Sequence, residues 1–365
     1  MQGPLFSTSD HSPSTMAATM KGIVFNGPYD VSLKDLPIPS ADAGSVVVRT
    51  LAAGLCGSDL HVYRGIEPVS STGFVMGHEM TGVVHEVGAG VTRFKVGDKV
   101  VSPFTISCGT CFYCTRGQSS RCESNRLFGC PLLEGCQAEY VKVPLADGTL
   151  ELAPADVPDA LLPLMADIFP TGYFAAARAL RGLSPEVLAD TVVAVVGCGP
   201  VAQCAIVSAL HFGPRAVIAI DSVAERRQQA AALGAQAADI GDAAAAVRAA
   251  TAGRGADVVL EVVGAADALR LAYDLIRPFG VISSIGVHNS AMPFSATDAY
   301  DKNVSAHFGR CPVRSVFADA LAVLRAHAAK LDGFVDTVLP LDACVDAYAR
   351  FDRREVRKIV FKPAP

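Results

Sequence analysis

Four cysteines follow one another closely in the pattern C-x2-C-x2-C-x7-C. Four thiolates fill the tetrahedral shell of Zn²⁺ and leave no position open for a substrate, so this spacing predicts a structural zinc site. Disulfides or unconnected thiols are the alternative interpretations of the same residues. The predicted ligands are Cys108, Cys111, Cys114 and Cys122.

A glycine-rich turn follows the apolar run Val192–Val196 and precedes a helical stretch. Its pattern, G-x-G-x-x-A, is a variant of the dinucleotide-binding fingerprint. The first glycine makes the tight turn, the second admits the pyrophosphate to the backbone, and the alanine lets the helix pack closely on the strand. An ordinary glycine turn of an α/β protein is the alternative. The predicted cofactor-binding residues of this turn are Gly197, Gly199, Pro200, Val201 and Ala202.

Asp221 closes the next apolar run, twenty-four residues after Gly197. A carboxylate at this place accepts hydrogen bonds from both ribose hydroxyls and repels a 2′-phosphate, so the sequence predicts NAD rather than NADP. The alternative is that Asp221 caps the following helix. Arg226, predicted to lie in the cofactor site, and Arg227 keep NADP open as a second possibility.

The elements that must position these residues change in character along the chain. Short β-rich segments punctuated by Gly and Pro occupy residues 20–143, whereas apolar runs alternate with helical stretches such as 224–233 after residue 160. Continuous apolar strands separated by helices indicate a parallel sheet covered on both faces. The strands expected in the first part are 22–25, 46–52, 81–87, 99–102 and 138–143, and those in the second are 192–196, 217–220, 258–263 and 281–285.

The predicted fold class is therefore α/β, a β-rich domain into which a doubly wound domain is inserted. A helix after residue 312 and a strand over 357–361 indicate a return to the first domain, so we assign residues 20–170 and 308–365 to the β-rich domain and 171–307 to the insertion. Residues 1–19 lack a basic region and an apolar core, and we interpret them as a disordered leader rather than a secretory signal.

The composition excludes several classes of partner. A chain of 365 residues that is 51% hydrophobic and 18% charged is typical of a globular protein. Its net charge of -5 gives no reason to expect nucleic acid or an anionic membrane as partner. No apolar run is long enough to span a bilayer. Eleven cysteines without a signal sequence favour a reducing compartment, and we expect a cytoplasmic protein.

Taken together, these motifs resemble the zinc-containing medium-chain alcohol dehydrogenases. The resemblance covers the chain from about residue 20 to 363 and implies a GroES-like catalytic domain with an inserted Rossmann domain. The residues that carry it are Cys56–His61, Gly77–Glu79, Cys108–Cys122, Thr171–Tyr173 and Gly197–Ala202.

By this resemblance, Cys56, His78 and Asp167 bind a catalytic zinc, giving two zinc ions per chain. One S, one N and one O ligand leave the fourth position open, as catalytic zinc requires. Many relatives have Cys at the position of Asp167, and Asp is typical of a bacterial and fungal branch. Glu79 lies beside the metal and enters its shell in some relatives. The alternative is that Asp167 caps the following helix and Glu79 is the permanent third ligand.

The resemblance also assigns a proton path and a phosphate contact. Ser58 matches the family's hydroxyl relay and His61 its terminal base, with a surface imidazole as the alternative for His61. We expect Asp59 to accept a hydrogen bond from the far nitrogen of His78, and Thr171 to pack near the nicotinamide. Arg357 resembles a phosphate-binding position, although an exposed strand cation is the alternative.

The expected activity is reversible hydride transfer between NAD and a small alcohol, aldehyde or ketone. A polyol dehydrogenase of the sorbitol or butanediol type and a formaldehyde dehydrogenase are alternatives within the family. A zinc-independent quinone or enone reductase and a non-enzymatic relative are alternatives outside this activity. The resemblance further implies a homo-oligomer, a tetramer rather than a dimer.

Overall fold

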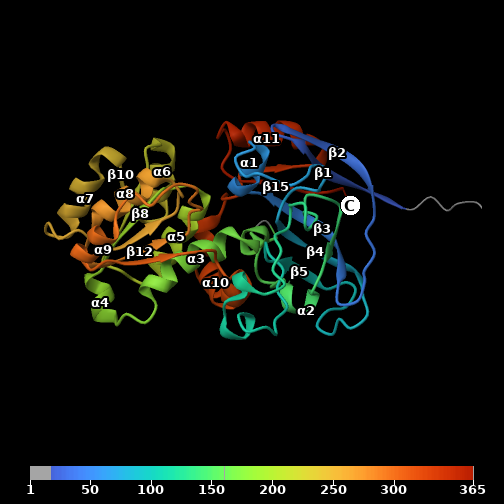
Figure 1. Ribbon diagram of the computed structural model, residues 1–365, viewed down its shortest axis with the longest axis horizontal. Helices are drawn as coiled ribbons and strands as arrows, with labels where there is room; N and C mark the ends of the chain where they lie inside the picture. Colours follow the sequence, from blue (N-terminus) through green and yellow to red (C-terminus); the bar gives the residue numbers. More distant parts are fainter. Residues whose placement is uncertain (1–17, 160, 365) are drawn as a thin grey trace, which may run out of the picture.

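The computed structural model describes residues 18–159 and 161–364. A β-rich part and an α/β part lie side by side along the long axis of the molecule (Figure 1). The predicted leader over residues 1–19 falls outside the described residues except at its last two positions, and β1 begins at Thr19. Among the helices of the described ranges, none is long and apolar enough to cross a membrane.

The β-rich part is built on a seven-stranded sheet in the order β14-β15-β3-β4-β5-β7, with β6 also paired to β3. The central strand β3 is covered on both sides, because Leu55 packs into one apolar cluster and Val48 into another. The strands are β1 (Thr19–Gly27), β2 (Asp30–Pro37), β3 (Val46–Leu55), β4 (Glu79–Val87), β5 (Lys99–Ser102), β6 (Tyr140–Val143), β7 (Glu151–Leu152), β14 (Thr337–Leu339) and β15 (Ile359–Phe361). The α-helices are α1 (Gly57–Tyr63), α2 (Ala146–Thr149) and α11 (Cys344–Asp352).

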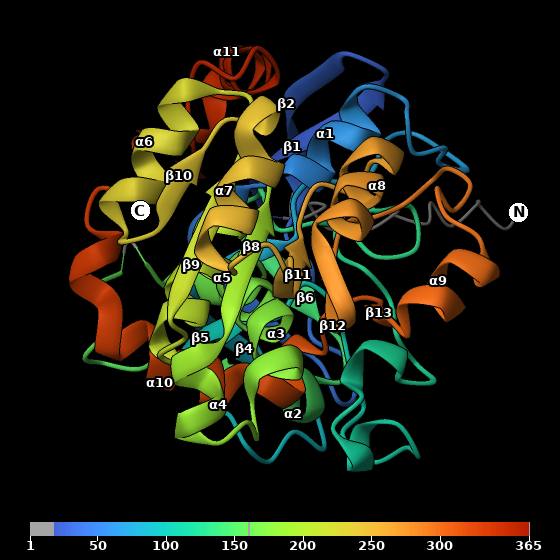
Figure 2. The same cartoon turned by 90° about the vertical axis from the view of Figure 1, so that its left-hand side faces the viewer.

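The α/β part holds a parallel six-stranded sheet in the order β10-β9-β8-β11-β12-β13, with helices on both faces (Figure 2). Its strands are β8 (Val192–Val196), β9 (Ala216–Ile220), β10 (Gln236–Ala238), β11 (Ala256–Glu261), β12 (Ile276–Ser284) and β13 (Ser305–Phe308). Its helices are α3 (Ile168–Leu180), α4 (Pro185–Asp190), α5 (Pro200–His211), α6 (Ala224–Ala232), α7 (Ala243–Ala250), α8 (Ala266–Leu275), α9 (Ala296–Lys302) and α10 (Val313–His327).

Strand β8 explains why this sheet is doubly covered. Alternate residues point to opposite faces, so Val193 and Val195 pack in the cluster that contains α3 and α5, while Val192 and Ala194 pack in the cluster that contains α8. A continuous apolar strand is stable only with helices on both sides. The predicted fold class is confirmed.

The strands that the sequence does not predict are β2, β7, β10, β13 and β14. Four of them, β7, β10, β13 and β14, end the two larger sheets. Strand β13 has only exposed residues, so no apolar run marks it. Strand β12 begins at Ile276 rather than 281, and β11 ends at Glu261 rather than 263, because Val263 lies beyond the sheet and is half exposed. The predicted boundary between residues 170 and 171 falls inside α3. Helix α10, which the sequence assigns to the β-rich domain, packs in one apolar cluster with α3 and α5. The domain ranges stay a prediction.

Candidate active site

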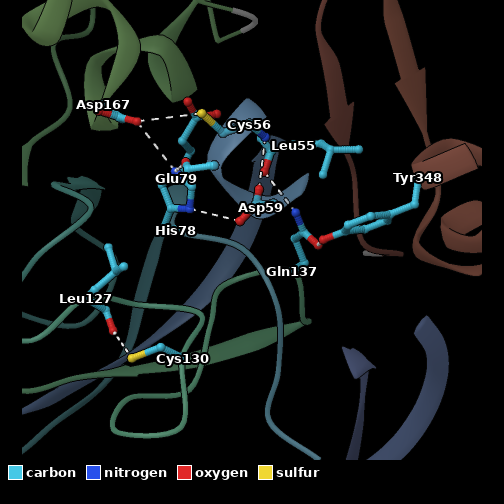
Figure 3. A network of polar contacts seen from close by, with 12 residues as sticks. Leu55, Cys56, Asp59, His78, Glu79, Leu127, Cys130, Gln137, Asp167 and Tyr348 are labelled. Atoms are coloured by element: carbon cyan, nitrogen blue, oxygen red, sulfur yellow. Dashed lines mark hydrogen bonds and ion pairs between the residues drawn. The ribbon is translucent and has the colours of Figure 1, made fainter. Parts of the chain in front are cut away.

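Two neighbouring strands and one helix start bring the first group of polar residues together. Cys56 follows β3, and His78 and Glu79 stand at the start of β4, which pairs with β3 so that Gly54 lies opposite Glu79. Asp167 directly precedes α3. One potential ligand atom from each of Cys56, His78, Glu79 and Asp167 lies within 4.8 Å of the others (Figure 3).

The two nitrogens of the His78 imidazole face different partners: Nδ1 faces Asp59, and Nε2 faces the cluster. Its Nδ1 lies 2.9 Å from Oδ1 of Asp59, whose Oδ2 accepts a hydrogen bond of 2.9 Å from the backbone N–H of Cys56. The carboxylate therefore holds the proton on Nδ1. The other nitrogen, Nε2, faces Oδ2 of Asp167 at 3.5 Å, and that oxygen lies 3.7 Å from Sγ of Cys56.

The charges of this cluster are those of a cation site. Burial lowers the pKa of His78, but the negative charge of Asp59 and the bond to Asp167 outweigh burial and raise this pKa well above its usual range. Burial raises the pKa of Asp167, and its contact with His78 reverses the shift and lowers that pKa below its ordinary value. A proton on His78 thus serves as the compensating positive charge, and a divalent cation can replace it.

The donor set fits zinc. Thiolate, imidazole and carboxylate are the ligand types that Zn²⁺ accepts in tetrahedral sites. Within the described residues, Oε1 of Glu79 is buried without a hydrogen-bond partner, and buried polar atoms are rarely left so unless something else binds them. Cys56, His78 and Asp167 would hold the ion, with Glu79 beside it.

Asp167 occupies the cap position of α3, yet its side chain makes no capping hydrogen bond. Its Oδ1 instead accepts a hydrogen bond of 2.8 Å from the hydroxyl of Thr171, which leaves Oδ2 facing the thiol and the imidazole. The helix-capping alternative therefore has no contact to support it. The predicted contact of Thr171 with a nicotinamide stays a prediction.

Lys358, which no sequence motif marks, is buried beneath the cluster. Its ammonium donates to Oε2 of Glu79 and, over 3.2 Å, to the carbonyl of Leu55; the Lys358 and Glu79 side chains are 1% and 0% exposed. Burial raises the pKa of Glu79, and Lys358 only partly opposes that shift. A Cβ on Gly54 would stand 1.8 Å from Oε2, so only glycine leaves room for this carboxylate.

The predicted proton path is present in part. The hydroxyl of Ser58 lies 3.3 Å from Nε2 of His78, so α1 brings it to the cluster. His61, one turn further on, is half-buried, and no side-chain hydrogen bond joins it to Ser58 in the described structure. The relay roles of both residues stay predictions.

The four-cysteine lobe forms a second compact group, with ligand atoms that also lie within 4.8 Å of one another. The backbone N–H of Cys108 lies 3.2 Å from Sγ of Cys122, and that of Cys111 lies 3.3 Å from Sγ of Cys108. Burial raises the pKa of Cys108, but the N–H and hydroxyl donors around its sulfur outweigh burial and lower the pKa to about 6. All eleven cysteines fall within the described ranges and are free thiols, so the disulfide alternative is absent from the structure.

The glycine-rich turn lies at the carboxyl end of β8. Gly197 has φ of +96°, which favours glycine. Gly199 caps α5, Pro200 is its first residue, and Ala202 is buried against the sheet. Val201, the remaining residue of the turn, packs partly buried against the core. The turn and the N-terminus of α5 together have the form of a pyrophosphate site.

Asp221 lies beside this turn at the end of β9. Its Oδ2 accepts a hydrogen bond of 2.8 Å from the backbone of Cys198, and its Oδ1 accepts one of 2.8 Å from Val223. Helix α6 begins three residues later with Val223 at its cap position, so Asp221 is not the cap. Arg226 approaches the same carboxylate at 3.9 Å.

Arg357 is engaged elsewhere in the structure. Its guanidinium donates to the carbonyls of Phe334, at 3.0 Å, and Gly333. These bonds fix the side chain against a loop, and its phosphate-binding role stays a prediction.

Comparison with known proteins places the chain in a family. Residues 42–154 match the alcohol dehydrogenase GroES-like domain, and residues 200–325 match the zinc-binding dehydrogenase domain. The zinc-type alcohol dehydrogenase B of Aspergillus flavus is 51% identical over 348 residues, which cover 94% of this chain and 81% of that protein. The chain belongs to the zinc-dependent medium-chain alcohol dehydrogenase family. It is an oxidoreductase of this family.

Two further proteins match most of this chain. The medium chain reductase/dehydrogenase ucsI of an Acremonium species is 55% identical over 287 residues, 77% of this chain and 98% of that protein. The alcohol dehydrogenase TADH from Thermus sp. ATN1 superposes with a TM-score of 0.88 at 34% identity, covering 94% of this chain and all of that one (100%).

Proposed function

We propose that this enzyme binds two zinc ions and catalyses reversible hydride transfer between NAD and a small alcohol, aldehyde or ketone. The observation that carries the proposal is the convergence of Cys56, His78 and Asp167 on one point, with Asp59 holding the far nitrogen of the imidazole. The chemistry that Zn²⁺ supplies in a site with an open position is polarisation of a substrate C–O bond.

The chain's own residues would divide the remaining work. Asp59 holds the proton of Nδ1 of His78 and thereby directs Nε2 at the cluster. Ser58, 3.3 Å from that nitrogen, carries a hydroxyl that can take a proton from an alcohol and pass it toward solvent. Lys358 compensates the charge of Glu79 and so reduces the negative charge beside Asp167.

NAD rather than NADP is the proposed cofactor. Asp221 is 8% exposed at the end of β9, where a ribose hydroxyl can reach it and a 2′-phosphate would be repelled. Arg226 would reverse this preference only by turning away from Asp221 toward a phosphate.

Two measurements test the proposal together. Metal analysis of the purified chain should give two zinc ions, and NADH should form with at least one member of a panel of primary, secondary and polyhydric alcohols. His78→Ala should keep the four-cysteine zinc, lose the other ion and lose turnover. Turnover in His78→Ala equal to that of the parent would contradict the zinc mechanism, and reduction of enones without bound metal would favour the reductase alternative.

We also infer that the protein assembles as a homo-oligomer, a tetramer in our proposal, in a reducing, cytoplasmic environment. Strand β13 supports assembly because it is a sheet edge with four exposed residues, including Phe308. Eleven free thiols support the reducing environment. Light scattering on the purified chain measures the oligomeric state directly, and a monomer would exclude this assembly.

A further inference from the structure

A second buried acidic residue lies outside the metal cluster, at the end of β11. Glu261 is fully buried, and both of its oxygens are saturated. Its Oε1 accepts hydrogen bonds from the backbone N–H groups of Val263, at 2.8 Å, and Gly264, at 2.7 Å. Its Oε2 accepts from the hydroxyl of Ser284, at 2.6 Å, and from Nε2 of His288, at 3.0 Å.

These bonds join two loops. Val263 and Gly264 follow β11, whereas Ser284 ends β12 and His288 comes four residues later. The loops also touch directly, because a Cβ on Gly286 would stand 2.2 Å from the nitrogen of Gly264. The network thus fixes the conformation of both loops at once.

The imidazole of His288 is the bond donor that closes this network from the second loop. Its side chain is 15% exposed, and its ring lies edge-on to Phe308 at the end of β13, with 6.2 Å between the ring centroids. Its Nε2 lies 3.0 Å from Oε2 of Glu261 and 2.9 Å from the hydroxyl of Ser284. An ionised carboxylate can only accept, so we assign the proton of the ring to Nε2 as the donor to Glu261.

The sheet order places these loops relative to the cofactor edge. Strand β11 is the direct neighbour of β8, with Glu261 opposite Val196, and a Cβ on Gly197 would stand 2.7 Å from a methyl of Val263. Asp221 directly follows β9, on the other side of β8. A dinucleotide bound across the carboxyl edge with its adenosine ribose at Asp221 therefore extends its other half over the ends of β11 and β12 (Figure 2).

The two loops expose apolar side chains at this edge. Val263 is 53% exposed and Val287 is 63% exposed. A half-exposed apolar surface is the type of surface that covers the face of a flat, weakly polar ring. The chemistry that fits here is a nicotinamide ring and its ribose.

We propose that Glu261, Ser284 and His288 are positioning residues for the nicotinamide half of the dinucleotide. They act through the two loops that carry Val263 and Val287 and do not touch the cofactor themselves. This inference rests on the proposed use of a nicotinamide dinucleotide.

The test compares two ligands that differ only in the nicotinamide half. NADH and ADP-ribose are titrated calorimetrically into the zinc-loaded full chain and into His288→Leu. Loss of the hydrogen bond that closes the network should weaken NADH binding about tenfold, whereas ADP-ribose binding should change by less than about twofold. Unchanged ADP-ribose binding also shows that the variant is folded.

Two further variants separate positioning from general disturbance. His288→Gln keeps an N–H donor at a similar reach and should restore most of the NADH affinity. His307→Leu replaces an exposed histidine on β13 and should leave both affinities unchanged.

Equal weakening of both ligands by His288→Leu, or no effect on NADH, would overturn the inference alone. A parent protein that binds neither ligand would refute the proposed function, and the inference with it.

Discussion

Replacing Lys358 by Met removes a buried positive charge and keeps a side chain of similar length. In the parent protein the Lys358 ammonium is the partner of Oε2 of Glu79, while Oε1 of the same carboxylate has no hydrogen bond within the described residues. The variant would therefore contain a fully buried carboxylate with neither oxygen paired to a cation.

The expected loss of folding stability in Lys358→Met follows from the burial of both Lys358 and Glu79. Removing one partner of a buried ion pair costs about 3–5 kcal/mol, because the remaining charge is left desolvated and uncompensated. Zinc bound beside Glu79 would supply part of the missing positive charge. The loss should thus be largest in metal-stripped protein and smaller in zinc-loaded protein.

The loss should also depend on pH. Burial raises the pKa of Glu79 and Lys358 lowers it, so the variant raises this pKa further. A carboxyl with a raised folded-state pKa is fully stabilising below its unfolded pKa of about 4.3, and that contribution disappears as the pH rises through the folded value. Relative to the parent, the free energy of unfolding of metal-stripped Lys358→Met should therefore be lower at about pH 8 than at about pH 5.

Urea unfolding of the parent and the variant, stripped and zinc-loaded, measures these differences. Adding Glu79→Gln to the variant removes the uncompensated charge and should recover most of the loss. Lys142→Met is the matched control, because Lys142 pairs with Asp42 over 2.6 Å at the surface, where an ion pair contributes little. If stripped Lys358→Met loses no more stability than Lys142→Met at the higher pH, the argument from buried charge is refuted.

Three other changes give separate tests. Asp221→Ala should weaken NAD binding by about 1–3 kcal/mol, the range of a charged hydrogen bond, and reduce discrimination against NADP; a parent that already prefers NADP would contradict this assignment. Asp59→Asn should lower zinc affinity at His78 about 10–100-fold in chelator competition, and an unchanged affinity would show that the carboxylate does not orient the ring. Burial raises the pKa of Cys108, but hydrogen bonds to its sulfur outweigh burial and lower the pKa to about 6, whereas burial raises the pKa of Cys114 to about 12. In metal-stripped protein, iodoacetamide should therefore alkylate Cys108 with a midpoint at about pH 6. Equal alkylation of Cys108 and Cys114, measured by mass spectrometry, would argue against this difference.

The sequence predicts the interior of the fold well and its margins poorly. Val192–Val196 is an unbroken apolar run, and its length and type specify a buried parallel strand with the observed bounds. Strand β13 carries no such signal, because an edge strand can form from exposed residues through backbone pairing alone. The start of β12 at Ile276 likewise depends on pairing with Ala256, which no local pattern encodes.

In the candidate site, too, the sequence predicts contacts between nearby residues and not those between distant ones. The spacing of Cys108 to Cys122 is local, so the sequence predicts that group without a known relative. Cys56 and Asp167 lie 111 positions apart, and only the resemblance to a family connects them. Lys358 has a charged neighbour and looks like any strand lysine, and its burial follows from the pairing of β15 with β3. Glu261 shows no motif, since its partners are backbone groups, a serine twenty-three positions away and a histidine twenty-seven positions away.

The pairing of β15 with β3 also determines when the site can form during protein synthesis. Leu55 and Lys358 are 303 positions apart, so at about 5–20 residues per second a ribosome needs roughly 15–60 s between the two. During that interval the carboxylate of Glu79 lacks its ion-pair partner, the ammonium of Lys358. With two zinc ions bound as proposed, loading at Cys56, His78 and Asp167 in their final geometry would therefore wait for the synthesis of β15, whereas the four-cysteine lobe could bind its ion earlier. A ribosome-stalled chain ending before β15 should accordingly retain one zinc ion and not two.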